Sequence, residues 1–269
     1  MLTGIKERNR QVLLYREDIY RGNLILVNRR YPVNNSFEKS EAAEAFENSL
    51  NGDVILEKTA ANMLTQLLRE CGAGNRIIPV SGFRSLKEQQ QIFSESIKEN
   101  GEAFTFKYVA LPNHSEHQTG LAVDMAQNHG KIDFLCPSFP YDGICGEFRR
   151  KASKYGFIER YGKGKEAITG ISHEPWHFRY VGYPHSEIME KNLFSLEEYI
   201  EYINAYKYGC NHLIYNNNQH VTEIFYFELK GETGMLSLDE YVPYQLSGNN
   251  RDGFIITVWR NSLWGKAYE

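Results

Sequence analysis

The sequence lacks the features that would place it in several broad classes of protein. No apolar run among its 269 residues is long enough to cross a bilayer as a helix, so we expect no membrane span. Basic residues are in slight deficit, with 30 Lys and Arg against 34 Asp and Glu, which argues against a nucleic-acid-binding protein. The first residues mix charges with a short apolar run and form no signal-peptide core, so we expect a cytoplasmic protein.

Cysteine is scarce, and its spacing excludes the usual sulfur sites. The chain has four cysteines, which are widely separated: Cys71, Cys136, Cys145 and Cys210. Because no C-x-x-C pair occurs, we expect free thiols rather than disulfides or a cysteine-bound zinc. The hydrophobic fraction of 42% is ample for a folded core, so a disordered chain is excluded.

Local patterns predict a mixture of helices and strands. The clearest helix covers 85–101, where Ser85 and Glu88 form an S-x-x-E capping box and Gly101 provides a stop. Helices are also expected at 57–71, 148–156 and 195–209, and strands at 22–33, 76–82, 121–126, 157–161, 176–182, 222–231 and 253–260. This mixed order predicts an α+β fold with a central antiparallel sheet flanked by helices. A shift in composition after residue 194 predicts a main domain, 1–194, and a small α+β extension, 195–269.

The stretch HEPWH, residues 173–177, matches the H-E-x-x-H motif of zinc-protease helices. That motif requires a helix, because only there do positions i and i+4 share a face. Pro175 would cost roughly 3 kcal/mol in a helix interior, and the alternation in WHFRYVG is typical of a strand. We therefore expect a loop entering a strand, in which His173 is not a ligand. If Glu174 and His177 take part in chemistry, the other metal ligands lie elsewhere.

The best source of further ligands is SEHQTGLAVD, residues 115–124. His117 offers an imidazole and Asp124 a carboxylate, and Gly120 allows a tight turn between them. A strand carrying Asp124 beside a strand carrying His177 would bring these three side chains together. Three nitrogen and oxygen ligands with a fourth position left for water are what a catalytic zinc site requires.

These two motifs carry a family resemblance. S-x-H-x-x-G-x-A-x-D at residues 115–124, followed by E-x-W-H at residues 174–177, resembles the VanY/VanX group of zinc D-Ala-D-Ala peptidases. That group belongs to the LAS superfamily (lysostaphin, D-Ala-D-Ala peptidases, sonic hedgehog). The chain is most similar to the VanXY type, the D,D-dipeptidase/D,D-carboxypeptidases of vancomycin-resistant bacteria. The similarity extends over most of residues 23–200 and leaves out roughly the last seventy residues.

The resemblance implies a role for each matching residue. His117, Asp124 and His177 would bind zinc, Glu174 would be the catalytic base, and Arg84 would face the scissile carbonyl. This agrees with general chemistry, because zinc polarises a carbonyl and acidifies its bound water. A glutamate can take the water proton and return it to the leaving amine, while a permanent cation stabilises the oxyanion.

Ser115 and Gln89 match positions that line the family's substrate pocket. The implied partners are peptides that end in D-Ala-D-Ala. Ser81 stands where some dual-activity relatives carry an acidic residue, which leaves the balance between dipeptide and longer substrates open. The sequence also leaves the oligomeric state open, a homo-oligomer included.

Two other functions compete with a cytoplasmic D,D-peptidase. An exported or phage-type wall endopeptidase would use residues 195–269 as a wall-binding module, but this tail has ten acidic and five basic residues, which suits an anionic wall poorly. A catalytically dead zinc fold used for binding would need neither Glu174 nor Arg84, and both are present. The peptidase therefore remains the favoured hypothesis.

Overall fold

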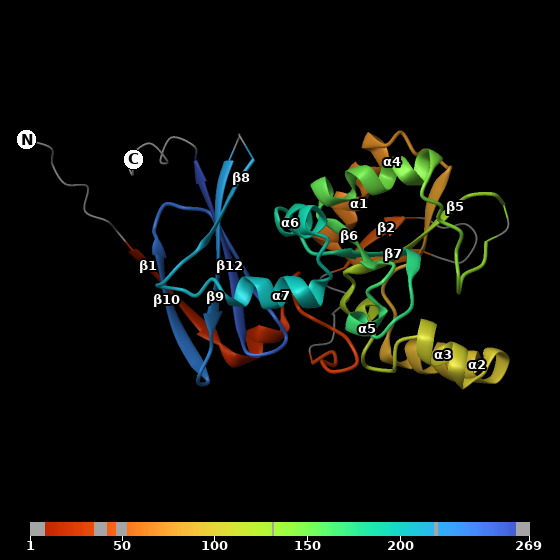
Figure 1. The fold of residues 1–269 in the computed structure, drawn as a ribbon, viewed down its shortest axis with the longest axis horizontal. Coiled ribbons are helices and arrows are strands. Elements are labelled where there is room, and N and C mark those ends of the chain that lie inside the picture. Colours follow the sequence, from red (N-terminus) through yellow and green to blue (C-terminus); the bar gives the residue numbers. More distant parts are fainter. Residues whose placement is uncertain (1–8, 35–41, 47–52, 131, 218–219, 262–269) are drawn as a thin grey trace, which may run out of the picture. The chain divides into compact units, whose positions relative to one another are not determined.

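The computed structural model describes residues 9–34, 42–46, 53–130, 132–217 and 220–261. The chain forms two compact units, one made of residues 26–199 and the other of the described parts of 1–25 and 200–269. Figure 1 follows both along the chain. Among the described residues, no helix is both long enough and apolar enough to cross a membrane.

A four-stranded antiparallel sheet forms the centre of the larger unit, as predicted. Its order is β4-β5-β7-β6, so the two inner strands are β5 and β7. The strands are β4 (Ile77–Ser81), β5 (Ala122–Gln127), β6 (Phe157–Tyr161) and β7 (Glu174–Tyr180). All four were expected from the sequence, and HEPWH lies at the beginning of β7 rather than in a helix.

Helices flank this sheet. Figure 1 shows α1 and α4 on one side of it and α2 and α3 on the other. The helices are α1 (Lys58–Glu70), α2 (Leu86–Asn100), α3 (Glu102–Tyr108), α4 (Gly143–Ala152), α5 (Glu166–Thr169), α6 (His185–Asn192) and α7 (Leu196–Asn204). Residues 200–204 of α7 belong to the smaller unit. Two 3-10 helices, η3 (Glu116–Thr119) and η4 (Ser153–Tyr155), and a hairpin of β2 (Ala42–Phe46) and β3 (Val54–Glu57) complete the unit.

The capping box predicted at the start of α2 is confirmed. The Ser85 hydroxyl accepts from the backbone N–H of Glu88 at 3.2 Å, and the Glu88 carboxylate accepts from the backbone N–H of Ser85 at 2.7 Å. These bonds satisfy donors that the helix leaves unpaired at its first turn. The helix is thereby fixed directly after Arg84.

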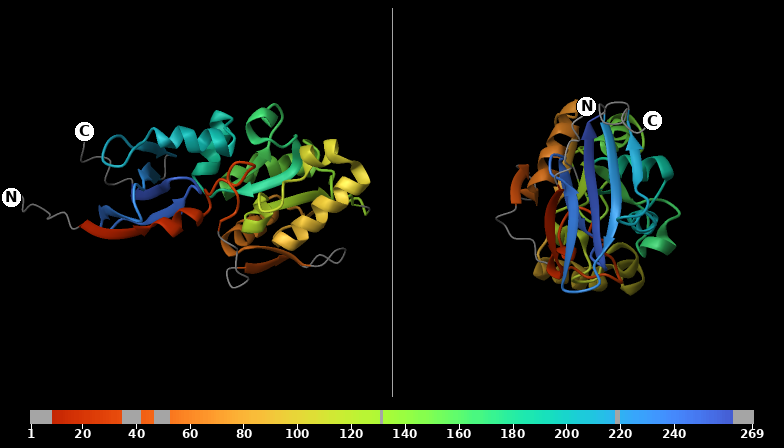
Figure 2. Two further views of the ribbon diagram at one scale, coloured as in Figure 1. Left: turned by 90° about the horizontal axis from the view of Figure 1, so that it is seen from below. Right: turned by 90° about the vertical axis from the view of Figure 1, so that its left-hand side faces the viewer.

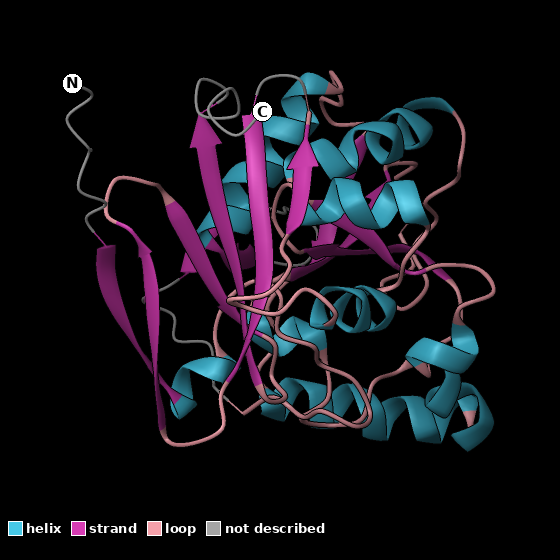
Figure 3. Ribbon diagram, turned by 60° about the vertical axis from the view of Figure 1, so that its left-hand side comes forward, coloured by secondary structure: helices cyan, strands magenta, loops and turns pink. Residues whose placement is uncertain are grey.

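The smaller unit consists mainly of strands (Figure 3). Its four-stranded sheet has the order β11-β12-β9-β8, and a separate two-stranded ribbon pairs β1 with β10. Figure 2 shows the long strands β9 and β12 side by side. The elements are β1 (Asn9–Tyr15), the 3-10 helix η1 (Arg16–Tyr20), β8 (Leu213–Asn216), β9 (His220–Glu228), β10 (Thr233–Asp239), β11 (Tyr244–Gly248) and β12 (Gly253–Asn261).

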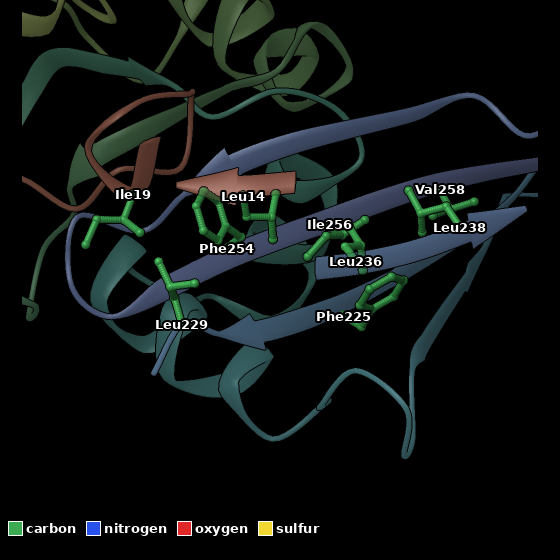
Figure 4. Close-up of a cluster of buried hydrophobic side chains, with 9 residues drawn as sticks. All are labelled: Leu14, Ile19, Phe225, Leu229, Leu236, Leu238, Phe254, Ile256 and Val258. Carbon is green, nitrogen blue, oxygen red and sulfur yellow. The ribbon is translucent and has the colours of Figure 1, made fainter. Parts of the chain in front are cut away.

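A hydrophobic cluster holds the ribbon and the sheet of this unit together. Figure 4 shows Leu14 and Leu236 from the ribbon among Phe225, Phe254 and Ile256 from the sheet. Each of these five side chains is at most 2% exposed. Burying a side chain of this size contributes about 1.5–3 kcal/mol, so the cluster accounts for the cohesion of the unit.

Two expectations from the sequence require correction. The expected division at residue 194 placed the N-terminus in the main domain, but residues 9–25 belong with the C-terminal unit. The reason is long-range pairing: β1 aligns with β10 from Asn9↔Asp239 to Tyr15↔Thr233, which no local pattern reveals. The strand expected at 22–33 is also absent. Leu24 is buried there, but its backbone N–H donates to the side-chain hydroxyl of Ser247 at 2.9 Å rather than to a backbone carbonyl of a neighbouring strand.

Candidate active site

The three proposed metal ligands come from one short helix and the two inner strands of the central sheet. His117 lies on η3, and Gly120, with a φ of 69°, turns the chain from that helix towards β5. Asp124 on β5 is directly opposite His177 on β7 in the antiparallel register. The side chains expected to converge are therefore brought together by backbone pairing.

The geometry of this cluster suits a metal ion. His117 Nε2 lies 3.1 Å from Asp124 Oδ2, and His177 Nδ1 lies 2.9 Å from Asp124 Oδ1. One ligand atom from each residue can be chosen so that all three are within 4.8 Å of one another. Two ligands of a tetrahedral zinc, each about 2.0–2.1 Å from the ion, lie roughly 3.3 Å apart. The three residues, which are at most 4% exposed, therefore fit a zinc site.

The imidazole of His117 is oriented by the backbone. Its Nδ1 lies 2.6 Å from the carbonyl oxygen of Gly82, which can only accept, so Nδ1 carries the proton and Nε2 is left as the ligand. Gly82 is a glycine for a steric reason: a Cβ at this position would collide with the carbonyl oxygen of Ile55.

The imidazole of His177 is turned the other way, with Nδ1 towards the cluster. Its Nε2 is buried, forms no hydrogen bond within the part of the chain that the structure describes, and lies 3.6 Å from Oε2 of Glu116. Although burial lowers it, the carboxylates of Asp124 and Glu116 raise the pKa of His177 to about 9. By contrast, burial and the charge of Arg84 lower the pKa of His117 to about 4. The carboxylates thus favour positive charge beside His177, which is what a divalent cation brings.

Glu174 begins β7 and points into the same cavity. Its Oε2 lies 3.9 Å from His177 Nδ1, and the residue is 5% exposed. Burial raises the pKa of Glu174 to about 8, with a further increase from the charge of Asp124 and decreases from His177 and Arg84. A carboxylate whose pKa lies near neutrality is suited to accepting and returning a proton, and a nearby cation would favour its ionised form.

Arg84 follows β4 and is held by three contacts. Its Nη2 donates to Asp124 Oδ2 at 2.8 Å, its Nε to the Ser81 hydroxyl at 3.0 Å, and its Nη1 to Gln89 Oε1 at 3.4 Å. The amide of Gln89 in turn donates to the carbonyl of Ala110 at 2.8 Å. Gln89 therefore orients the guanidinium from a buried position, in addition to lining the cavity.

A cavity of about 330 Å³ unites these residues, a volume in the range of small-molecule sites. Ser115, which is 2% exposed, also lines it. All seven residues singled out from the sequence lie in its wall. The complete lining is Val80, Ser81, Arg84, Gln89, Ile92, Tyr108, Val109, Ala110, Ser115, Glu116, His117, Asp124, Phe134, Leu135, Tyr161, Ile171, Glu174, Trp176 and His177.

His173 lies apart from this cluster. Its Nε2 is 2.7 Å from the hydroxyl of Tyr141 and 3.2 Å from Glu159 Oε1. Because β7 is extended, His173 and His177 do not share a helical face. The H-E-x-x-H match is therefore accidental.

Sequence reasoning missed a buried charged layer behind His177. Oε1 of Glu116 accepts from Arg160 Nε and Arg179 Nη1, each at 2.8 Å, and all three side chains are fully buried. Although burial raises it, these two cations hold the pKa of Glu116 well below its usual value. The available signal was an arginine among the aromatic and apolar residues of the strands FIERY and WHFRYV. Tyr161 was also missed; its ring packs on His177 with centroids 4.8 Å apart.

Comparisons with known proteins show consistent similarities. A family model described as VanY, D-alanyl-D-alanine carboxypeptidase, matches residues 53–183. The bifunctional D-Ala-D-Ala dipeptidase and D-Ala-D-Ala carboxypeptidase VanXYC of Enterococcus gallinarum is 41% identical over 182 residues, 67% of this chain and 94% of that protein.

Two solved structures extend the comparison. The vancomycin resistance D,D-dipeptidase VanXYg, in complex with a D-Ala-D-Ala phosphinate analogue, is 50% identical with a TM-score of 0.90, covering 94% of this chain and 100% of that one. The vancomycin resistance D,D-pentapeptidase VanY in complex with Zn(II) is 31% identical with a TM-score of 0.50, over 66% of this chain and 98% of that one. The match to VanXYg is long enough to include most of the smaller unit.

Proposed function

Because the chain belongs to the VanY family of D-alanyl-D-alanine carboxypeptidases and is therefore a peptidase, we propose that it is a zinc-dependent D,D-peptidase contributing to vancomycin resistance. Its substrates are the free dipeptide D-Ala-D-Ala and cell-wall precursors that end in D-Ala-D-Ala. The family membership confirms the resemblance that the two sequence motifs indicated. The structure and its match to VanXYg confirm the predicted α+β fold. The observation that carries the proposal is the buried cluster of His117, Asp124 and His177 beside Glu174 in one cavity.

In this proposal His117 Nε2, Asp124 and His177 Nδ1 would hold the ion. The donor set of two imidazoles and a carboxylate is that of catalytic rather than structural zinc sites. The ion would supply a Lewis acid for the scissile carbonyl and a water of lowered pKa. Glu174 Oε2 takes a proton from the attacking water and returns it to the amine of the departing D-alanine.

Arg84 provides a permanent positive charge at the reacting carbonyl. Its contacts with Ser81, Gln89 and Asp124 fix the guanidinium before substrate binds. A donor that is already in place stabilises the developing oxyanion without the cost of reorganisation. In this proposal Ser115, which lines the same cavity, contacts the C-terminal carboxylate of the substrate.

Selectivity for D-Ala-D-Ala follows from the resistance role. An enzyme that destroyed substitute termini ending in D-lactate or D-serine would undo the pathway that makes them. In physical terms, a pocket fitted to a methyl group would bury the hydroxyl of D-serine without a hydrogen-bond partner. This would weaken the binding free energy by about 1–3 kcal/mol. Discrimination by such a pocket alone is about 10²-fold. We place the reaction in the cytoplasm, where dipeptide and soluble precursor are made.

The test combines metal analysis with turnover. Purified protein is incubated with D-Ala-D-Ala, D-Ala-D-Ser and a pentapeptide ending in D-Ala-D-Ala, and kcat/KM is measured for each. We expect one zinc per chain and a clear preference for D-Ala-D-Ala over D-Ala-D-Ser. His117→Ala should lose both zinc and turnover. Full activity in metal-free protein would overturn the mechanism, and equal rates on the two dipeptides would overturn the resistance role.

A further inference from the structure

Two buried polar atoms behind the proposed metal site have no hydrogen-bond partner among the described residues, and they lie next to each other. They are Nε2 of His177 and Oε2 of Glu116, separated by 3.6 Å. A buried polar atom without a partner costs about 1–3 kcal/mol, so such atoms are rare in folded proteins. That two of them are neighbours points to a hydrogen bond that a small shift of either side chain would close.

The position of Glu116 is fixed from its other side. Its Oε1 is held by Arg160 and Arg179, and Arg160 is itself bound by both carboxylate oxygens of Glu197, at 2.7 and 2.8 Å. Turning Glu116 away from His177 would therefore break its hydrogen bonds to two buried guanidinium groups. Its Oε2 remains aimed at the edge of the imidazole opposite Asp124.

The tautomer of His177 links this contact to the metal site. An imidazole that binds metal through Nδ1 must carry its proton on Nε2, and that N–H needs an acceptor. Ligating histidines almost always have such an acceptor, which fixes the ring and makes the ligating nitrogen more basic. For His117 the acceptor is the Gly82 carbonyl; for His177 a buried carboxylate stands in the equivalent place.

We infer that Glu116 is a positioning residue: it accepts the Nε2–H of His177 and so presents Nδ1 to the metal. The inference rests on the proposed metal site. Glu116 touches neither the ion nor the substrate in this role, and Arg160 and Arg179 keep its carboxylate in place. The site is thus built with a neutral acceptor behind one histidine and an anionic acceptor behind the other.

A second role for Glu116 is structural, since it neutralises two buried cations. Removing one partner of a buried ion pair destabilises a fold by about 3–5 kcal/mol. The test must therefore separate lost stability from lost ligand orientation. Glu197 offers a matched control, because its carboxylate also pairs with Arg160 and its other hydrogen bond is to Asn28 rather than to His177.

Glu116→Gln and Glu197→Gln are compared with the parent protein. Each change removes one negative charge from the partners of Arg160 and keeps the shape of the side chain. In Glu116→Gln, an amide oxygen kept by the two arginines would turn the NH₂ group, a donor, towards the Nε2–H of His177. Zinc affinity, measured by competition with a chromophoric chelator, should fall about 10–100-fold in Glu116→Gln. It should change little in Glu197→Gln, although both variants melt earlier than the parent.

A spectroscopic signature completes the test. In the zinc-loaded parent, ¹⁵N-edited NMR should show His177 with its proton on Nε2 and that proton far downfield, as expected for a bond to a carboxylate. This resonance should move upfield in Glu116→Gln and stay in place in Glu197→Gln. A zinc-loaded parent with the proton on Nδ1 would overturn the inference even if Glu116→Gln does not fold. Equal zinc affinities in the two variants would also overturn it.

Failure of the positioning role and failure of the proposed function give different results. A parent protein that binds no metal, with or without added zinc, would remove the proposed metal site itself. A parent that binds zinc and hydrolyses D-Ala-D-Ala, with a Glu116→Gln variant no weaker in zinc binding than Glu197→Gln, would refute only the positioning role.

Discussion

The sheets of the two units bury different kinds of side chain. Between them, the inner strands of the central sheet bury Asp124, Glu174 and His177, as well as the fully buried Arg179. The sheet of the smaller unit buries Phe225, Phe254, Ile256 and Val258 together with uncharged hydroxyl residues. Among the described residues, every buried Asp, Glu, Arg and His belongs to the larger unit.

This difference shows where free energy of folding is given up for function. Burying a charge is costly unless it is paired, so a sheet that serves packing alone has no reason to contain several. The buried charges of the central sheet have close partners: Asp124 pairs with Arg84 and His177, and Arg179 pairs with Glu116. Asp124, Glu174 and His177 line one cavity. Substitutions in the central sheet should therefore act on chemistry, and substitutions in the smaller sheet on stability.

The largest effect should come from Glu174→Gln. The amide keeps the shape of the side chain but cannot accept a proton from water, so kcat should fall by ~10²–10⁴. Zinc content should be unchanged, because Glu174 is not among the three proposed ligands. Release of D-alanine and metal content are measured on the same preparation. Turnover near that of the parent would remove Glu174 from the role of base.

Arg84→Ala should cost on the order of 10²–10³ in kcat, the scale of a lost oxyanion donor. Arg84→Lys keeps the charge but cannot reproduce the three contacts to Ser81, Gln89 and Asp124, so it should recover only part of this loss. Steady-state kinetics on D-Ala-D-Ala distinguish the two. A loss confined to KM would show that Arg84 binds substrate without stabilising the transition state.

His185 is a buried histidine outside the cavity, and we expect its protonation to affect the stability of the fold alone. Burial lowers its pKa to about 3 from 6.5, and Nδ1 lies 2.6 Å from the hydroxyl of Tyr199. The unfolded chain therefore binds the proton first as the pH falls below 6.5, and stability is lost progressively from there down to pH 3. Between pH 7 and pH 5, this residue alone should lower the free energy of unfolding by about 2 kcal/mol.

Urea unfolding at pH 7 and pH 5 measures this loss. His185→Gln cannot be protonated, so it should show a smaller difference between the two pH values than the parent does. The same pH dependence in both proteins would assign the acid sensitivity to other groups.

Ile256→Val removes one methylene group from the cluster of the smaller unit, where Ile256 is fully buried. The free energy of unfolding should fall by about 0.5–1.5 kcal/mol. kcat and KM should remain those of the parent, because the residue lies outside the unit that contains the cavity. A clear change in kcat, measured well below the unfolding transition, would contradict the expectation that the smaller sheet affects stability alone.

The smallest effect is expected for His173→Ala. This residue contacts Tyr141 and Glu159, and neither is a proposed ligand or catalytic group. Zinc content and turnover should both be retained. An empty metal site in this variant would restore the H-E-x-x-H interpretation of HEPWH.

The sequence predicted what depends on neighbours along the chain. The capping box located α2, and the alternation in WHFRYVG predicted β7. Two short motifs identified five residues of the cavity wall, and the wider family resemblance added Arg84 and Gln89. It could not predict that β1 pairs with β10, because that contact joins residues more than 200 positions apart. The layer of Glu116, Arg160 and Arg179 was missed for a related reason. A charged residue is expected to face solvent unless its partner is known, and these partners are distant in the sequence.

Gly82 illustrates how a position without a side chain can be as constrained as a ligand. Its carbonyl orients His117, and a Cβ at this position would collide with the Ile55 carbonyl oxygen, so no larger residue fits. Any substitution must displace either β3 or the carbonyl that holds the histidine. In a saturation-mutagenesis screen for resistance, position 82 should therefore tolerate as few replacements as positions 117, 124 and 177, and only the backbone would explain why.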